Sequence, residues 1–395
     1  MSQYRCNSEV QKPGLILVHE PGLETKLAVQ HPNHWGFDPS LVEEKRPYHK
    51  WLEDAQAEHR AMVSAIRAEG IDTVYVTDLL RQKEDACRRY LKQEIDKAKA
   101  KPGLSTRARK AIREYADKAV ETPVDATIRG LEIADSFREM PYAEKIAVYR
   151  KLRTLMPQTS LYYTQDGVIS APGGLIEAKM GMWDRVQEPK ILRIALGDEN
   201  YVYEVEHRAE GGDITMADKK SMHGGDILYK DGVMLVGVSR VGGLGIVKEA
   251  ERLAKAANVE DLLFFYMPDI FDPQLAYATG NIMHFDTLAN PVEPGVLLAN
   301  KEMLKKTGVF LNNRLVDGYN WAKRNYDTLV EVPDEEQPLW AANVLPVGNR
   351  KVLSSPSFKR TNKNLRKKGL SVVEISSDTL TQGFGCFHCM TAYLK

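Results

Sequence analysis

The C-terminal stretch TQGFGCFHCMTAYLK, residues 381–395, places two cysteines and a histidine within the last ten residues of the chain. Cys386 and Cys389 stand three apart, and His388 lies between them. Three kinds of site fit such a cluster: a metal site, a redox pair, or a single nucleophile whose partners come from distant parts of the chain. The rest of the sequence discriminates among these three.

A metal site and a redox pair both lack support elsewhere in the sequence. Structural zinc takes about four ligands, but Cys386 and Cys389 supply two, and the chain has no second Cys-x-x-Cys and no His-x-His pair. The other cysteines, Cys6 and Cys87, are isolated. A thioredoxin-like pair is followed by a helix, whereas only MTAYLK follows Cys389. We therefore favour a single nucleophile and expect neither a metal nor another cofactor.

The composition is that of an ordinary globular protein, with 43% apolar and 27% charged residues. Basic and acidic side chains balance at 54 each, so bulk charge gives no reason to expect nucleic acid or an anionic membrane as a partner. The N-terminal MSQYRCNSEVQKPG has no apolar signal core, and no window approaches the ~18 apolar residues of a membrane span. Four cysteines are too few for a disulfide framework. We expect a reduced, cytoplasmic protein, and a homodimer remains an option.

Apolar periodicity divides the chain into three parts. Residues 1–79 contain a buried strand at Leu15–Val18, an amphipathic helix ended by Gly70, and a second strand in TVYV. Residues 80–157 are charged, helix-periodic segments separated by Pro and Gly, which predicts an all-helical insertion with solvated faces. Residues 158–395 return to mixed strands and helices, with strands expected in SLYYTQDGVIS, GGLIEAK and ILRIAL among others. We predict one α/β catalytic domain, residues 1–79 and 158–395, interrupted by the insertion.

Partners for the cysteine are available in three short segments. NIMHFDT holds His284 and Asp286 two apart, so that on a strand they point to the same side, and a histidine near a carboxylate can serve as general acid and base. MHGGD places His223 and Asp226 around two glycines, which permit close approach to a ligand. YYTQDG ends an apolar run with Asp166. Taken singly, each segment is more simply explained as a turn or a satisfied hydrogen bond.

In chain order, these segments resemble the guanidino-group-modifying superfamily, whose members include arginine deiminases and amidinotransferases. The shared pattern is an Asp, then x-Gly-Gly-Asp, then His-x-Asp, then a C-terminal Gly-x-Gly-x-x-x-Cys-Met-Thr. SEVQKPGLILVHEPGLE is similar to an arginine deiminase N-terminus, and the helical insertion sits where deiminases carry theirs. GGLIEAKMGMWDR, PVEPGVLLAN and FHC are more similar to amidinotransferases. The resemblance implies a fivefold pseudosymmetric α/β propeller (pentein) whose last strand carries the nucleophile into a central site.

The resemblance also implies roles for individual residues. Cys389 matches the nucleophile, which attacks an amidine carbon and forms a covalent amidino-cysteine intermediate. His284 matches the general acid and base. Asp166 and Asp286 match carboxylates that hold the planar cation through paired hydrogen bonds. Arg185 sits where deiminases hold an arginine for the substrate α-carboxylate, a task that suits a planar guanidinium.

Departures from the family pattern bear on the substrate. His223, a candidate catalytic residue, stands where the family has a carboxylate that binds the guanidinium, and Asp226, a candidate substrate-binding residue, follows three residues later. Arg240 is a further candidate for substrate binding, but it lies out of register with the deiminase arginine near it. The deiminase arginine before the nucleophile is replaced within GFGCFHC. Cys386 matches no catalytic position. We therefore expect a small guanidino or amidine substrate other than plain arginine.

Three functions remain open on the sequence. Hydrolysis of a guanidino-type C–N bond is favoured, because the N-terminus and the insertion look deiminase-like. Transfer of the amidino group to an amine is the alternative. A third option, of another class, is a non-catalytic ligand-binding protein that kept the fold after losing a carboxylate.

Overall fold

The computed structural model describes residues 2–6, 8–35, 37–41, 45–204, 221–230, 232–240, 242–275, 282–311 and 314–395. These residues form five β-sheets, and each sheet contains the same three-stranded unit. The first two strands of a unit are antiparallel, and the third runs parallel to the second. The units are β17-β1-β2, β3-β4-β5, β6-β7-β8, β9-β10-β13 and β14-β15-β16.

The strands are short, as expected for repeats that each bury one small sheet. Their bounds are β1 Leu15–Val18, β2 Asp72–Tyr75, β3 Val168–Ala171, β4 Gly174–Glu177, β5 Tyr201–Glu204, β6 Ile227–Lys230, β7 Val233–Val238, β8 Asp261–Tyr266, β9 Ala289–Glu293, β10 Val296–Ala299, β11 Gly308–Leu311, β12 Arg314–Asp317, β13 Thr328–Glu331, β14 Leu345–Pro346, β15 Lys351–Ser354, β16 Ser371–Glu374 and β17 Ala392–Tyr393. The hairpin β11–β12 extends the third sheet to five strands.

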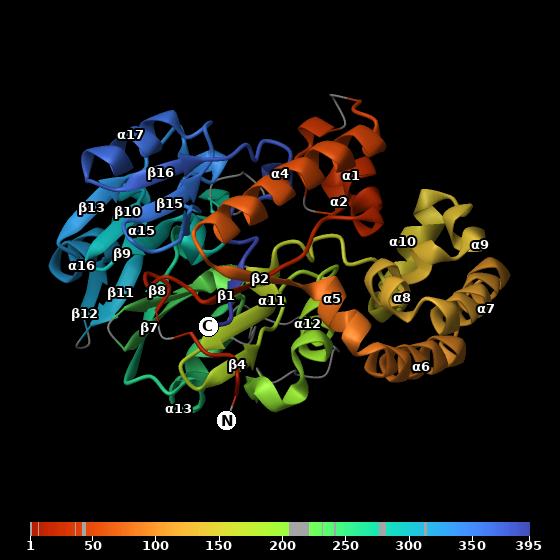
Figure 1. Ribbon diagram of the computed structural model, residues 1–395. Helices are drawn as coiled ribbons and strands as arrows, with labels where there is room; N and C mark the ends of the chain where they lie inside the picture. The colour runs from red at the N-terminus through yellow and green to blue at the C-terminus, as the bar shows by residue number, and fades with distance from the viewer. Residues whose placement is uncertain are drawn as a thin grey trace.

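In every unit a helix connects the second strand to the parallel third strand, because a parallel pair needs a crossover. Figure 1 shows these helices spread around the sheets. They are α4 Tyr48–Ala68, α12 Glu188–Leu196, α13 Ala250–Ala257, α16 Gly318–Asn325 and α17 Lys359–Lys367, with the shorter α1 Lys26–Gln30, α2 Pro32–Trp35, α14 Pro268–Phe271 and α15 Lys301–Lys306 beside them.

The two ends of the chain complete the first unit together. β17 pairs antiparallel with β1, with Ile16 opposite Tyr393, and in Figure 1 the C-terminus lies among the sheets. The last strand of the chain therefore completes the first unit. The five units make up the fivefold pseudosymmetric α/β propeller that the sequence led us to expect, and this pairing explains how a residue near the C-terminus can reach the centre.

Residues 84–155, all of which the structure describes, contain helices and no strand. They form a group beside the sheets, at the right of Figure 1. Buried apolar side chains such as Ile112, Tyr115 and Phe137 fill the space between the helices. The helices are α6 Glu84–Ala100, α7 Thr106–Glu121, α8 Pro123–Arg129, α9 Asp135–Arg138 and α10 Tyr142–Lys151, and α5 Val76–Gln82 leads into them from β2.

Two predicted strands are wrong. Most of SLYYTQDGVIS forms turns and the short helix α11 Thr164–Gly167, and the strand begins only at Val168. ILRIAL lies in the helix α12, because its apolar residues recur at helical spacing after Pro189, a residue favoured in the first turn of a helix. Gly197, with φ of 92°, ends that helix in a conformation that favours glycine.

Candidate active site

The turn that precedes the first strand of each unit places one polar residue at the centre. Asp166 precedes β3, Asp226 precedes β6, Asp286 precedes β9, Asn343 precedes β14 and Cys389 precedes β17. All five are buried. Equivalent positions in a fivefold arrangement face the same central region, so residues spread over more than 200 positions of sequence meet there.

The Gly-Gly of MHGGD is required by close packing at this centre. A Cβ on Gly224 would lie 1.7 Å from the carbonyl oxygen of Gln165. A Cβ on Gly225 would lie 2.9 Å from Nδ1 of His284 and 3.1 Å from Oδ1 of Asp166. These two glycines let the turn of the third unit approach the turns of its neighbours.

His284 lies between a carboxylate and a second histidine. Its Nδ1 is 3.2 Å from Oδ1 of Asp166, and its Nε2 is 2.6 Å from Nδ1 of His223. Burial lowers the pKa of His284, but the carboxylates of Asp166 and Asp226 outweigh burial and raise this pKa to about 9. His284 and Asp286 lie in a short 3-10 turn, Phe285–Thr287, which His284 caps.

One contact opposes a positive charge on this histidine pair. The backbone N–H of Gly181 donates to Nε2 of His223 at 2.8 Å, which favours a proton on Nδ1 of His223 and a bare Nε2 on His284. The carboxylates of Asp166 and Asp226 nevertheless favour a second proton on His284. That proton would lie on Nε2, so His223 would have to lose its proton on Nδ1 and its contact with Gly181.

Arg185 is occupied by carboxylates. Its guanidinium donates to both oxygens of Glu188, to Oδ2 of Asp166 at 2.6 Å, and to the carbonyl of Ser160. Burial lowers the pKa of Arg185, but Glu188 and Asp166 outweigh it and raise this pKa above its ordinary value. Burial raises the pKa of Asp166, but His284 and Arg185 outweigh burial and hold this pKa well below its ordinary value. Arg185 thus fixes Asp166 as a carboxylate.

The loop that carries Cys389 is anchored by Asn343. Oδ1 of Asn343 accepts from the backbone N–H of Cys386 at 2.9 Å and of Cys389 at 3.1 Å. The thiol of Cys389 donates to Oδ2 of Asp286 at 3.4 Å. Burial and the carboxylate of Asp286 raise the pKa of this thiol well above its ordinary value. Both effects favour the protonated thiol.

A second histidine lies on the other side of Asp286. Nδ1 of His388 is 2.7 Å from Oδ2 of Asp286, and its Nε2 is 3.9 Å from Oε2 of Glu9. Burial lowers the pKa of His388, but the hydrogen bond to Asp286 outweighs it and raises this pKa. Burial raises the pKa of Glu9 to about 7. The N-terminal segment thus contributes a carboxyl group to the centre.

Several carboxylate oxygens at the centre have no hydrogen-bond donor among the described residues. These are both oxygens of Asp226 and Oδ1 of Asp286. Burial raises the pKa of Asp226 to about 7, and a bound cation would favour its ionised form. A planar cation with several N–H groups could donate hydrogen bonds to these oxygens and compensate their negative charge.

His223, Asp226 and His284 lie close enough to consider a metal ion, with one ligand atom from each within 4.8 Å of the others. A ligating histidine normally donates its second ring N–H to an acceptor. His223 does the opposite, because its Nε2 accepts from Gly181 while its Nδ1 contacts His284. The residues present therefore do not fit a metal site well.

The structure brings most of the predicted site residues together, but not all of them. Cys389, His284, His223 and the three aspartates converge, and Arg185 contacts Asp166. Arg240 is exposed, and its backbone N–H donates to Asp269, so its role in substrate binding stays a prediction. Cys386 is buried beside Ser377, and burial raises the pKa of its thiol to about 12.

Three residues of the centre were missed: Glu9, Asn343 and His388. A lone Asn in AANVLP and a lone Glu in NSEVQ carry no motif. The signal that identifies Asn343 is its position before β14, which becomes visible only when the five units are superimposed. His388 was seen only as a neighbour of the cysteines.

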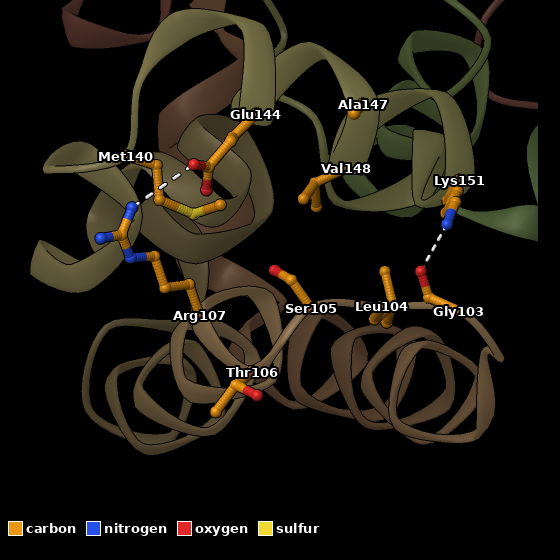
Figure 2. Close-up of a pocket in the computed structure, with 10 residues that line it drawn as sticks. All are labelled: Gly103, Leu104, Ser105, Thr106, Arg107, Met140, Glu144, Ala147, Val148 and Lys151. Carbon is orange, nitrogen blue, oxygen red and sulfur yellow. Dashed lines mark hydrogen bonds and ion pairs between the residues drawn. The ribbon is translucent and has the colours of Figure 1, made fainter.

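An open pocket of about 440 Å³ lies away from this centre, between α10 and the start of α7 (Figure 2). Arg107 pairs with Glu144 there, and Lys151 donates to the carbonyl of Gly103. None of its lining residues, all of which are described, has a buried side-chain polar atom without a partner.

No helix among the described residues is long and apolar enough to span a membrane.

The chain is similar in sequence to a known protein family. The chain matches the sequence model of the family described as arginine deiminase over residues 48–330 and 320–395. It is 24% identical to the arginine deiminase of Clostridium perfringens over 432 residues, which cover 97% of this chain and 96% of the relative.

Solved structures share the fold at low identity. The inosamine-phosphate amidinotransferase of Streptomyces griseus aligns with a TM-score of 0.56 at 12% identity, covering 100% of this chain and 97% of that one. A DDAH from Pseudomonas aeruginosa, complexed with citrulline, aligns with a TM-score of 0.54 at 14% identity, covering 96% and 98%.

Proposed function

Because this chain belongs to the arginine deiminase family, we propose that it is a cysteine-dependent hydrolase of a C–N bond in a guanidino or amidine compound. Cys389 is the nucleophile, and His284 is the general acid and base. Asp166, Asp226 and Asp286 hold the cation.

One observation carries this proposal: buried carboxylate oxygens of three aspartates face a centre that also contains a thiol. Among the described residues, no donor reaches either oxygen of Asp226 or Oδ1 of Asp286. Leaving such groups unsatisfied costs about 1–3 kcal/mol each, so the site is built for a ligand that donates hydrogen bonds. A guanidinium or amidinium is such a ligand, and its charge also compensates the carboxylates.

The same charges explain how the thiol becomes reactive. In the free protein, burial and Asp286 raise the pKa of Cys389, so the thiol keeps its proton. A bound cation offsets the carboxylate charge, which lowers the cost of forming the thiolate. The nucleophile is then generated when the substrate is present.

The reaction follows in two steps. Once the thiol of Cys389 has released its proton to solvent, Sγ attacks the amidine carbon, and the C–N bond breaks as a protonated His284 gives its proton to the departing nitrogen. The product of this step is a thiouronium adduct on the cysteine, with His284 now neutral. His284 then takes a proton from water, which attacks the same carbon and releases the thiol. An amine in place of water would give amidino transfer.

The pairing of Arg185 bears on whether the substrate carries an α-carboxylate. Its guanidinium is buried and already paired with Asp166 and Glu188. A substrate α-carboxylate placed there would have to displace one of these two carboxylates. His223 cannot bind the α-carboxylate instead of Arg185, because both ring nitrogens of His223 already have hydrogen-bond partners. We therefore propose a substrate without an α-carboxylate at this position, held chiefly by Asp226 and Asp286.

A matched pair of compounds tests this assignment. L-arginine and agmatine differ only in the α-carboxylate, and both are assayed for ammonia and for the ureido product, within a panel of guanidino and amidine compounds. We expect turnover of at least one carboxylate-free compound and less turnover of L-arginine. The assay is repeated with an acceptor amine. Transfer of the amidino group without ammonia release would replace hydrolysis by amidino transfer, and no turnover in the whole panel would contradict both.

A further inference from the structure

His388 has no part in the reaction proposed above, yet it is buried and contacted from two sides. Its Nδ1 lies 2.7 Å from Oδ2 of Asp286, and its Nε2 lies 3.9 Å from Oε2 of Glu9. The segment that carries Glu9 is tied to the C-terminal strand, where the N–H of Arg5 donates to the carbonyl of Leu394 at 2.8 Å. The imidazole therefore sits between two acidic side chains in a fixed frame.

The two oxygens of Asp286 differ in their surroundings. Oδ2 accepts from His388 and from the thiol of Cys389, whereas Oδ1 has no hydrogen-bond partner among the described residues. The last torsion of an aspartate has a broad, shallow preference. A carboxylate anchored at one oxygen therefore presents the other in a defined direction only while the anchor is in place.

We propose that His388 is a positioning residue, whose Nδ1–H holds Oδ2 of Asp286 so that Oδ1 faces the substrate cation beside Cys389. Supporting groups of this kind keep binding residues in their productive orientation. The inference rests on the proposed function, because it assumes that a cation binds next to the thiol. It adds a residue that acts through Asp286 and does not touch the substrate.

Two polar substitutions of His388 distinguish a positioning role toward Asp286 from a role in packing alone. The amide nitrogen of an asparagine occupies about the place of the histidine Nδ1, and that of a glutamine about the place of Nε2. His388→Asn therefore keeps a donor toward Asp286. His388→Gln moves the donor to the side of Glu9 and leaves Oδ2 of Asp286 with the thiol alone.

The test is the reactivity of Cys389 toward two alkylating reagents of similar shape. Chloroacetamidine is cationic and chloroacetamide is neutral, and both form an S–C bond to the cysteine with loss of chloride. The ratio of the two rates reports how well the carboxylates hold a cation beside the thiol. The neutral reagent corrects for general changes in thiol access. Peptide mapping confirms that Cys389 is the site, and thermal unfolding confirms that each variant is folded.

We expect His388→Asn to keep the wild-type ratio within about threefold. His388→Gln should lower it roughly tenfold or more, the scale for losing a hydrogen bond to a charged group. Equal ratios in the two variants would overturn the inference. Should His388→Gln not fold, His388→Asn decides alone, because a tenfold loss in that variant would also overturn it. A wild-type protein without preference for the amidine would instead contradict the proposed function itself.

Discussion

Glu9 provides a stability test of the buried centre, because a carboxyl group with a raised pKa makes folding depend on pH. Burial raises the pKa of Glu9 from an ordinary 4.5 to about 7. Between these values the folded protein binds a proton that the unfolded chain has lost, so stability falls as pH rises through this window. The full pKa shift of Glu9 corresponds to about 3 kcal/mol in the free energy of unfolding. This stabilising contribution is fully present below pH 4.5 and is lost above pH 7.

Glu9→Gln keeps a neutral side chain of similar shape at every pH. We expect it to match the wild type within about 1 kcal/mol at pH 5 and to exceed it by about 3 kcal/mol at pH 8. The free energy of unfolding in urea is measured for both proteins at the two pH values. Glu53→Gln, at a side chain that is 68% exposed, serves as the control and should show no pH-dependent difference. A constant difference between wild type and Glu9→Gln at both pH values would refute the reasoning.

The remaining predictions concern the loop that carries Cys389 and the proposed cation-binding aspartates. Cys389→Ala should reduce turnover to background, whereas Cys386→Ala should keep most of it, and similar losses in both would revive a redox pair. Asp226→Asn should lower kcat/KM by roughly 10²-fold, because it removes the charge that two unpaired oxygens offer the substrate; unchanged kinetics would remove Asp226 from the site. Asn343→Leu should lower the free energy of unfolding by about 2–4 kcal/mol, since two buried backbone N–H groups lose their acceptor. Asn343→Asp, which keeps the acceptor oxygen, should recover most of that loss.

The α/β class and the position of a C-terminal cysteine at the centre could be predicted from sequence, because the aspartate, x-Gly-Gly-Asp, His-x-Asp and cysteine motifs keep the order of the family that they resemble. The helix around Trp51, Ala55 and Met62 could also be predicted, since these residues recur at helical spacing. All three are buried in α4. ILRIAL shows the limit, because a short apolar run fits a strand or a buried helix equally well.

The details of the centre depend on contacts between units and could not be read from sequence. The pairing of Arg185 with Glu188, three residues away on one turn, redirects a residue expected to bind substrate. The thiol of Cys389 meets the carboxylate of Asp286 only because two units face each other. Glu9 reaches the centre because the chain termini pair, and no local pattern indicates such an arrangement.

The most direct test of the central claim is the site and rate of alkylation in the wild-type protein, since it needs no knowledge of the natural substrate. If Cys389 lies beside carboxylates that hold a planar cation, chloroacetamidine should modify it at least about tenfold faster than chloroacetamide, in line with the attraction of a cation to a site of opposite charge. Guanidinium chloride at non-denaturing concentration should protect it, and Cys386 should remain unmodified. Equal rates for the two reagents, or modification at Cys386 in place of Cys389, would contradict the claim.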